Sequence, residues 1–185
     1  GSAYLKISEG CNNRCSFCAI PLIRGDLRSK DRASVVGEAR NLLDTGAKEL
    51  VVIGQDCGSY GTDRGRAEIV DLIDEILEIP GDYMIRLLYI HPDHFPDGIL
   101  DLMSRDSRLL PYFDLPFQHA SPSILASMGR RGRSDSYLGL IERIRSAVPE
   151  AAIRSTFLVG YPGETRSDFY ALQEFQERAR LEWVG

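Results

Sequence analysis

The sequence contains no apolar run of the roughly 18 residues that a membrane span needs, and no charged leader followed by an apolar segment. It therefore predicts a cytoplasmic chain without a membrane or secretory segment. A basic excess is also missing, because 22 Lys and Arg residues stand against 27 Asp and Glu residues, for a net charge of -5. This balance argues against strong nucleic-acid binding by counterion release, while it leaves a basic protein open as a substrate.

Cysteine is scarce as well. Only four cysteines occur, and three of them lie between positions 11 and 18. Such clustering does not suit the disulfide framework of a secreted domain. It is typical of a metal or redox site in a reducing compartment.

Short apolar runs alternate with helical patterns along the chain, which predicts five strand–helix units. Apolar positions spaced i, i+3, i+4 and i+7 indicate helices, and apolar runs without alternation indicate parallel strands buried on both faces. Gly1 and Ser2 resemble the remnant of a cleaved tag, and residues 3–185 are expected to form one domain. The predicted strands cover 4–8, 49–54, 84–90, 112–117 and 153–159, and the predicted helices cover 34–45, 68–79, 97–104, 123–128 with 134–148, and 166–180.

Repeated strand–helix units fold either as a doubly wound open sheet or as a barrel. A complete eight-unit barrel needs roughly 250 residues, so the 185 residues of this chain supply about six units. Residues 181–185 resemble the opening of a sixth strand. We therefore predict an α/β fold, namely a partial TIM-type β/α barrel of five to six strand–helix units, truncated at its C-terminal end and without flanking domains.

Cys11, Cys15 and Cys18 form a C-x3-C-x2-C pattern directly after the first predicted strand. Three thiolates on one loop can each bind one iron of a 4Fe-4S cluster, which leaves the fourth iron open. The C-terminal ends of barrel strands are also where barrel active sites are built. The alternative is a structural zinc site that adds Cys57 or a histidine to these three ligands, but the spacing is not that of paired zinc knuckles. A lone Cys57 is more typical of a small buried thiol.

With the aromatic Phe17 before the last cysteine, this pattern resembles the signature of the radical S-adenosylmethionine (SAM) superfamily. Further segments resemble its methylthiotransferases, over nearly the whole chain. Within that family, residues 88–94 and 114–119 resemble the branch that modifies a ribosomal protein more than the branch that modifies transfer RNA. The segments of wider resemblance are Ile7-Ser8-Glu9-Gly10-Cys11-Asn12, Ile20-Pro21 with Arg24-Gly25, Gln55-Asp56 with Ser59-Tyr60-Gly61, and Gly160-Tyr161-Pro162-Gly163-Glu164-Thr165.

The resemblance implies a radical SAM core domain over residues 3–185 that binds a 4Fe-4S cluster and SAM. An electron donor would reduce the cluster, SAM would be cleaved, and a methylthio group would be added to the β-carbon of an aspartate in small-subunit ribosomal protein twelve. Family members also carry an N-terminal domain with a second cluster and a C-terminal domain suited to nucleic acid. The alternatives are a methylthiotransferase that acts on an adenosine of tRNA and a zinc-stabilised binding module without catalysis.

The same resemblance assigns residues to the cofactors and none to catalysis. A turn with Glu164 in the first turn of the next helix is the alternative interpretation of residues 160–164. His91 and His94 are spaced like a metal pair, but no set of nearby carboxylates completes it, and we expect them to hydrogen-bond locally or to line the substrate cleft. The implied cluster ligands are Cys11, Cys15 and Cys18, and the implied SAM contacts are Phe17, Gln55, Gln118, Gly160 and Glu164.

Overall fold

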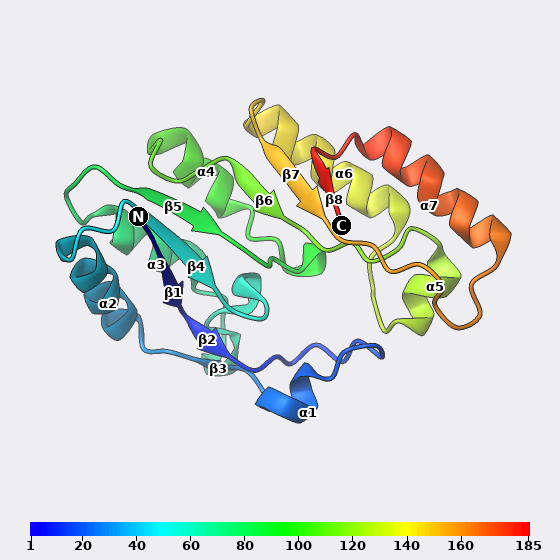
Figure 1. The fold of residues 1–185 in the computed structure, drawn as a ribbon, viewed down its shortest axis with the longest axis horizontal. Coiled ribbons are helices and arrows are strands. Elements are labelled where there is room, and N and C mark those ends of the chain that lie inside the picture. Colours follow the sequence, from blue (N-terminus) through cyan, green and yellow to red (C-terminus); the bar gives the residue numbers. More distant parts are fainter.

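Six parallel strands follow one another around an open, curved sheet in the computed structural model, which describes residues 1–185 (Figure 1). The first half has the order β1-β4-β5 and the second half has the order β6-β7-β8, with an isolated parallel bridge from Ile85 to Leu109 between them. The outer strands β1 and β8 do not pair with each other, so the barrel is open. These strands are β1 (Ser2–Lys6), β4 (Glu49–Ile53), β5 (Met84–Leu87), β6 (Tyr112–Asp114), β7 (Ala152–Ser155) and β8 (Trp183–Val184).

Helices cover the outer face of this sheet and bury its apolar side chains. In α3, the residues Ile69, Leu72, Ile73 and Ile76 are almost completely buried, as the spacing of one apolar helix face requires. Leu50 and Val52 of β4 are fully buried beneath the helices, and each such side chain contributes about 1.5–3 kcal/mol by leaving water. The helices are α1 (Ile20–Arg24), α2 (Arg32–Asp44), α3 (Ile69–Leu77), α4 (Gly98–Arg105), α5 (Pro122–Ser127), α6 (Ser134–Ala147) and α7 (Arg166–Ala179).

The predicted barrel is confirmed, and each predicted strand and helix has a counterpart within a few residues of its expected ends. β8 supplies the sixth strand expected from residues 181–185. Several short features escaped the sequence patterns, among them the helix α1 and the antiparallel pairing of β2 (Ser8–Glu9) with β3 (Arg28–Ser29). Both are too short to show a period. Ser2 belongs to β1 and its side chain hydrogen-bonds to Glu49, 2.6 Å away, so the strand begins two residues earlier than predicted.

The inner, concave face of the sheet carries paired charges. Arg86 lies in register with Val51 of β4, next to the buried Ile85 and Leu87, so its side chain points to the opposite face from theirs. Its Nε lies 2.7 Å from an oxygen of Glu49. Arg154 lies within β7, and its Nη1 lies 3.0 and 3.1 Å from the two oxygens of Asp114 on β6. Ion pairs thus bridge neighbouring strands on the inner, concave face of the sheet.

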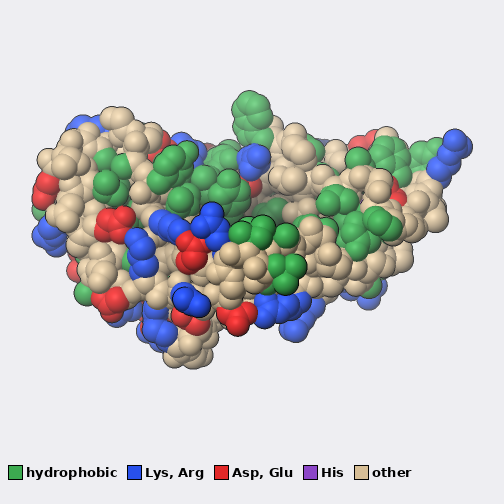
Figure 2. Space-filling model, turned by 60° about the horizontal axis from the view of Figure 1, so that its bottom comes forward, with side chains coloured by type: hydrophobic (Ala, Val, Ile, Leu, Met, Phe, Trp, Pro, Cys, Tyr) green, Lys and Arg blue, Asp and Glu red, His purple; other side chains and the backbone are tan.

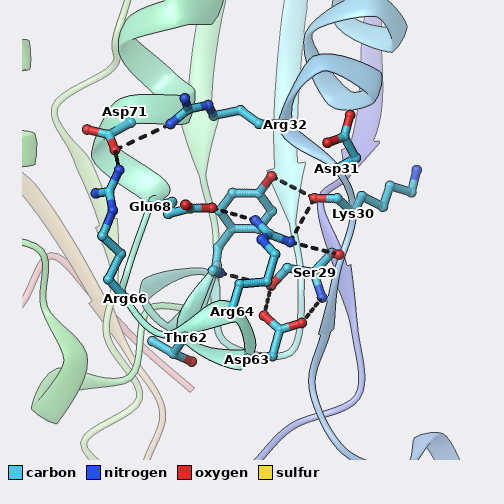
Figure 3. A network of polar contacts seen from close by, with 12 residues as sticks. Ser29, Lys30, Asp31, Arg32, Thr62, Asp63, Arg64, Arg66, Glu68 and Asp71 are labelled. Atoms are coloured by element: carbon cyan, nitrogen blue, oxygen red, sulfur yellow. Dashed lines mark hydrogen bonds and ion pairs between the residues drawn. The ribbon is translucent and has the colours of Figure 1, made fainter.

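A polar network joins the end of β3 and the residue after it to the loop that follows β4 (Figure 3). The Arg64 guanidinium donates to the carbonyl oxygens of Ser29 and Lys30 at 3.0 and 3.3 Å, and to Glu68 at 2.5 Å. Asp63 accepts hydrogen bonds from the backbone N–H and the hydroxyl of Ser29. The loop after β4 is therefore fixed against the return strand of the segment that carries the cysteines.

None of the helices combines the length and the apolar character required to span a bilayer.

Candidate functional site

The three clustered cysteines lie on a loop that leaves β2 and returns through α1. Gly10 opens this loop with φ +73°, and a Cβ atom there would lie 2.2 Å from the carbonyl oxygen of Asp26, so only glycine fits. The backbone N–H of Cys11 donates to Gly25 at 3.2 Å, and the Asn12 side chain accepts from the N–H of Leu27 at 3.0 Å. These bonds hold the two ends of the loop together.

The middle of the loop is docked on the C-terminal end of α5. The N–H of Ser16 donates to the carbonyl of Met128 at 3.1 Å, and its hydroxyl donates to the carbonyl of Ser127 at 2.8 Å. The Tyr161 hydroxyl lies 2.7 Å from the Ser16 hydroxyl. Gly129 has φ +72°, and a Cβ atom on it would lie 2.9 Å from the carbonyl oxygen of Arg14. The second half of the fold therefore helps to shape the cysteine loop.

The three thiols of this loop differ from the fourth in exposure. Cys11, Cys15 and Cys18 are each partly exposed, whereas Cys57 is fully buried and burial raises its pKa strongly. Burial also raises the pKa of Cys11, although this thiol is only partly buried. Since metal ligation requires thiolates, the loop thiols are the accessible donors and Cys57 is a core residue, as its isolation in the sequence predicted.

The cysteine loop fits an iron–sulfur cluster better than a single ion. No group of three or more His, Cys, Asp or Glu side chains lies close enough to hold one metal ion. A tetrahedral zinc site needs four donors around one point, whereas a cubane cluster takes each thiolate on a separate iron. Cys57 cannot complete a zinc site from its place in the core, and His94 is hydrogen-bonded to Asp56. The donor set therefore favours the cluster over zinc.

A small cavity of about 260 Å³ adjoins two of these cysteines at the ends of β4 and β5. Gln55 contributes to it, and its side-chain oxygen Oε1 is buried without any hydrogen-bond partner. Such an acceptor is costly to leave unpaired, so it is suited to a donor on a bound molecule. The cavity is lined by Cys11, Cys18, Ile20, Gly54, Gln55 and Tyr89.

Two non-glycine residues near this rim have positive φ. Tyr89 follows β5 with φ +56° and is 46% exposed, and Gln118 follows β6 with φ +70°. The backbone of Gln118 bridges to the strand beside it, donating to Thr156 and accepting from Leu158. Such backbone strain costs about 1–3 kcal/mol and tends to cluster at functional sites. Tyr89 was missed from the sequence, because no local pattern predicts its conformation.

The segment from Gly160 to Glu164 is linked to the cysteine loop through Tyr161. Glu164 precedes α7 and is not part of its first turn, because Thr165 caps that helix. One oxygen of Glu164 accepts from the Tyr161 N–H at 3.0 Å, and the other lies 3.8 Å from the buried Nε2 of His119. The helix-dipole interpretation of Glu164 is therefore wrong. Phe17, Gln118, Gly160 and Glu164 do not line the cavity beside Gln55.

Asp56 is the buried anchor of the loop after β4. Its carboxylate accepts from Asn13 of the cysteine loop at 3.1 Å, from Ser59 at 2.6 Å and from the backbone N–H of His91 at 3.1 Å, and it lies 2.7 Å from Nδ1 of His94. Burial raises its pKa, but the hydrogen bonds from His94, Ser59 and His91 outweigh this effect and hold the pKa at about 2. The ionised carboxylate thus joins the cysteine loop to the turn after β5.

The His91 and His94 rings stack with centroids 4.9 Å apart. Burial and the nearby Arg130 lower the pKa of His91 to about 4, so this ring is neutral near pH 7. Because His94 bonds to Asp56 and Ser59, the pair is engaged in local hydrogen bonds, as expected from the sequence. His94 also lines a second cavity of about 620 Å³ beside Asn13 and Cys15.

Figure 2 shows the molecule with the cysteine loop turned forward, and apolar side chains surround a hollow near its centre.

Sequence comparison links this chain to proteins of known class. The model of the radical SAM superfamily matches residues 5–175. A relative from Moorella thermoacetica, named ribosomal protein uS12 methylthiotransferase RimO, is 46% identical over 184 residues. A relative of the same name from Thermus thermophilus is 47% identical over 194 residues. The alignments cover 99% of this chain but only 43% and 44% of these relatives, so the chain spans less than half of their length.

Structural comparison gives the same fold at low sequence identity. The radical SAM methyltransferase TsrM from Kitasatospora setae, solved with cobalamin and a 4Fe-4S cluster bound, has a TM-score of 0.80 at 20% identity and covers the whole chain, which spans 36% of TsrM. Coproporphyrinogen III oxidase (HemN) from Escherichia coli has a TM-score of 0.64 at 13% identity, over 99% of this chain and 43% of its own. At these identities the likeness shows a common fold.

Proposed function

The chain belongs to the radical SAM superfamily, and from this premise we propose that it is the core of a methylthiotransferase, with a 4Fe-4S cluster held by Cys11, Cys15 and Cys18. The observation that carries the proposal is the cysteine loop itself. It presents three partly exposed thiols at the C-terminal end of the first barrel strand, next to a cavity with an unpaired acceptor. Barrel enzymes place their chemistry at this end.

The bound cluster would supply the electron that cleaves SAM, and the protein's own residues would position the cofactor. We assign Gln55 to the SAM amino group, because its buried Oε1 needs a donor and adjoins Cys11 and Cys18. Gln118, Gly160 and Glu164 are assigned to the rest of SAM, and Phe17 to packing beside it. Gln118 is held in a strained conformation at a strand end, and Tyr161 ties the Gly160–Glu164 turn to Ser16.

We propose that the substrate of the whole protein is an aspartate of ribosomal protein uS12, whose β-carbon receives the methylthio group. The support is the name shared by relatives that are 46% and 47% identical over nearly all of this chain. Residues 3–185 would form the radical SAM core domain in the cytoplasm. An electron donor would reduce the cluster, and any contact with nucleic acid would come from the rest of the protein.

The ligand assignment is tested with the full-length protein after anaerobic reconstitution with iron and sulfide. Changing Cys11, Cys15 or Cys18 singly to Ala is expected to abolish the cluster of this domain, because each thiolate holds one iron. Cys57→Ala is the matched control and is expected to retain it, since this thiol is buried in the core. Iron and sulfide content, together with the electron paramagnetic resonance (EPR) signal that responds to SAM, provides the readout. Loss with Cys57→Ala but not with the others contradicts the assignment.

The substrate is tested by incubating the reconstituted protein with SAM, a reductant, inorganic sulfide as the sulfur source and either uS12 or tRNA. Mass spectrometry is expected to show an added methylthio group on an aspartate of uS12 and no modified adenosine. Modification of the tRNA alone would contradict the substrate proposal and leave the cluster proposal intact. A colourless protein with stoichiometric zinc would overturn both.

A further inference from the structure

Arg130 is the only arginine or lysine that is buried in this structure. It is 7% exposed, whereas every other arginine and lysine keeps more contact with solvent. It lies three residues beyond the end of α5, and its backbone N–H donates to the carbonyl of Leu125 at 2.9 Å. Gly129 lets the chain pass within van der Waals distance of Arg14 just before this point, so the Arg130 side chain enters beneath the cysteine loop.

The buried guanidinium of Arg130 has no carboxylate partner. Its Nη2 donates to the carbonyl of Pro116, its Nη1 lies 3.9 Å from Sγ of Cys15, and its Nε is buried without any hydrogen-bond partner. None of the ion pairs of the structure includes it. Tyr137 packs nearby with its own hydroxyl unpaired, and burial raises the pKa of that hydroxyl to about 12, so it supplies no negative charge.

A buried cation without a counter-charge is strongly unfavourable, and arginine cannot escape by losing its proton. Because no carboxylate pairs with this cation, another negatively charged group must balance it. Cys15 is the group within reach that can provide one, because a thiolate bound to iron is negatively charged. With three thiolates on a core of two positive charges, the cluster carries one net negative charge, and a one-electron reduction doubles it.

We propose that Arg130 is the counter-charge of the cluster at Cys15 and stabilises its reduced form. This inference rests on the proposed cluster site. The charge of Arg130 is fixed, and the negative charge of the cluster grows when it accepts an electron, so the attraction is stronger in the reduced state. Removing the positive charge makes the cluster harder to reduce. Arg130 thereby acts on the electron transfer that precedes SAM cleavage, without contact to the substrate.

The test is a redox titration of the full-length protein, followed by the EPR signal that responds to SAM. At a fixed potential, R130M is expected to lower the ratio of reduced to oxidised cluster about tenfold, which equals about 59 mV for a one-electron couple. R130K keeps the charge and is expected to fall between R130M and the wild type. R133Q removes an exposed positive charge three residues away and is expected to titrate like the wild type.

A second measurement separates the electrostatic role from a structural one. In the cluster-free protein, R130M is expected to melt at or above the wild-type temperature, because it removes an uncompensated buried charge. If R130M loads no cluster but keeps this stability, the counter-charge role is supported. The role is overturned if R130M binds the cluster and the reduction potential of that cluster is unchanged. It is also overturned if R130M destabilises the cluster-free protein as much as the cluster-loaded protein, because the loss is then structural. Wild-type protein without a cluster would instead refute the proposed function.

Discussion

Replacing Asp56 with Asn is the sharpest test of how the cysteine loop is held. The Oδ2 oxygen of Asp56 accepts from Asn13, Ser59 and His94, and Oδ1 accepts from the N–H of His91. An amide can present its oxygen to one of these sides only, so its NH2 group must face a donor on the other. D56N therefore removes the charge and leaves at least one buried donor unpaired.

The magnitude follows from the pKa of Asp56. The pKa falls from 3.8 to about 2 in the folded protein, and at about 1.4 kcal/mol per unit this shift corresponds to about 2.5 kcal/mol of stability. A lowered carboxyl pKa stabilises the fold fully above the unfolded value of 3.8, and this contribution is lost as the pH falls towards 2. The hydrogen bond that His94 donates to Asp56 raises the pKa of His94, and that contribution is complete below 6.5 and is lost as the pH rises through the raised value.

Urea unfolding of the cluster-free chain at pH 5.5 measures the effect, because both groups are charged there. D56N is expected to lower the free energy of unfolding by about 2–3 kcal/mol, with an unchanged dependence on urea concentration. D82N, at an exposed loop carboxylate, is expected to stay within about 0.5 kcal/mol of the wild type. The wild type is expected to lose stability on both sides of the window from pH 4 to 6.5, and D56N to lose less. If D56N matches D82N in both respects, Asp56 is not the anchor.

Three further outcomes are expected. Gly10→Ala is expected to destabilise the chain by about 2–4 kcal/mol in urea unfolding, because the added Cβ would clash with Asp26 and φ is positive there. As the control, Gly37→Ala in the open middle of α2 is expected to stabilise the chain by up to about 1 kcal/mol. Equal effects of the two changes would contradict the packing at Gly10. Gln118→Ala and Glu164→Ala are expected to weaken the EPR response to SAM while the iron content stays constant, and unchanged SAM affinity in both would remove them from the site. Thr165→Ala removes the hydroxyl that caps α7 and is expected to cost about 1 kcal/mol in thermal or urea unfolding, whereas no loss would show that Asp168 alone suffices.

The repeated units of the barrel were predictable because each carries its signal locally. The apolar run of β4 and the spacing of Leu72, Ile73 and Ile76 in α3 need no knowledge of distant residues. The same is true of the cysteines, whose spacing alone indicates a ligand set on one loop. Resemblance to a family added Gln55, which the structure places beside Cys11 and Cys18.

The surroundings of the cysteines were not predictable in this way. Asp56 meets Asn13 across 43 positions, and Arg130 reaches Cys15 across 115 positions. Arg130 lies in the sequence beside Arg131 and close to Arg133, and such basic clusters are usually exposed. Only the packed structure shows that Arg130 is buried. The positive φ of Tyr89 likewise depends on the tertiary bonds of its backbone, since Cys57 donates to its carbonyl.

The docking of Ser16 on the end of α5 has a consequence for the order of folding. Its bonds to Ser127 and Tyr161 span 111 and 145 positions, so nearly the whole chain must be in place before they close. Contacts of such long range form late, because the chain loses the entropy of closing a long loop before the contact contributes any stabilising energy. During synthesis, β1, β4 and β5 can therefore pair while the cysteine loop is still undocked. The three cysteines therefore reach their final arrangement only when the second half of the barrel is in place, although their thiols stay partly exposed in the folded chain.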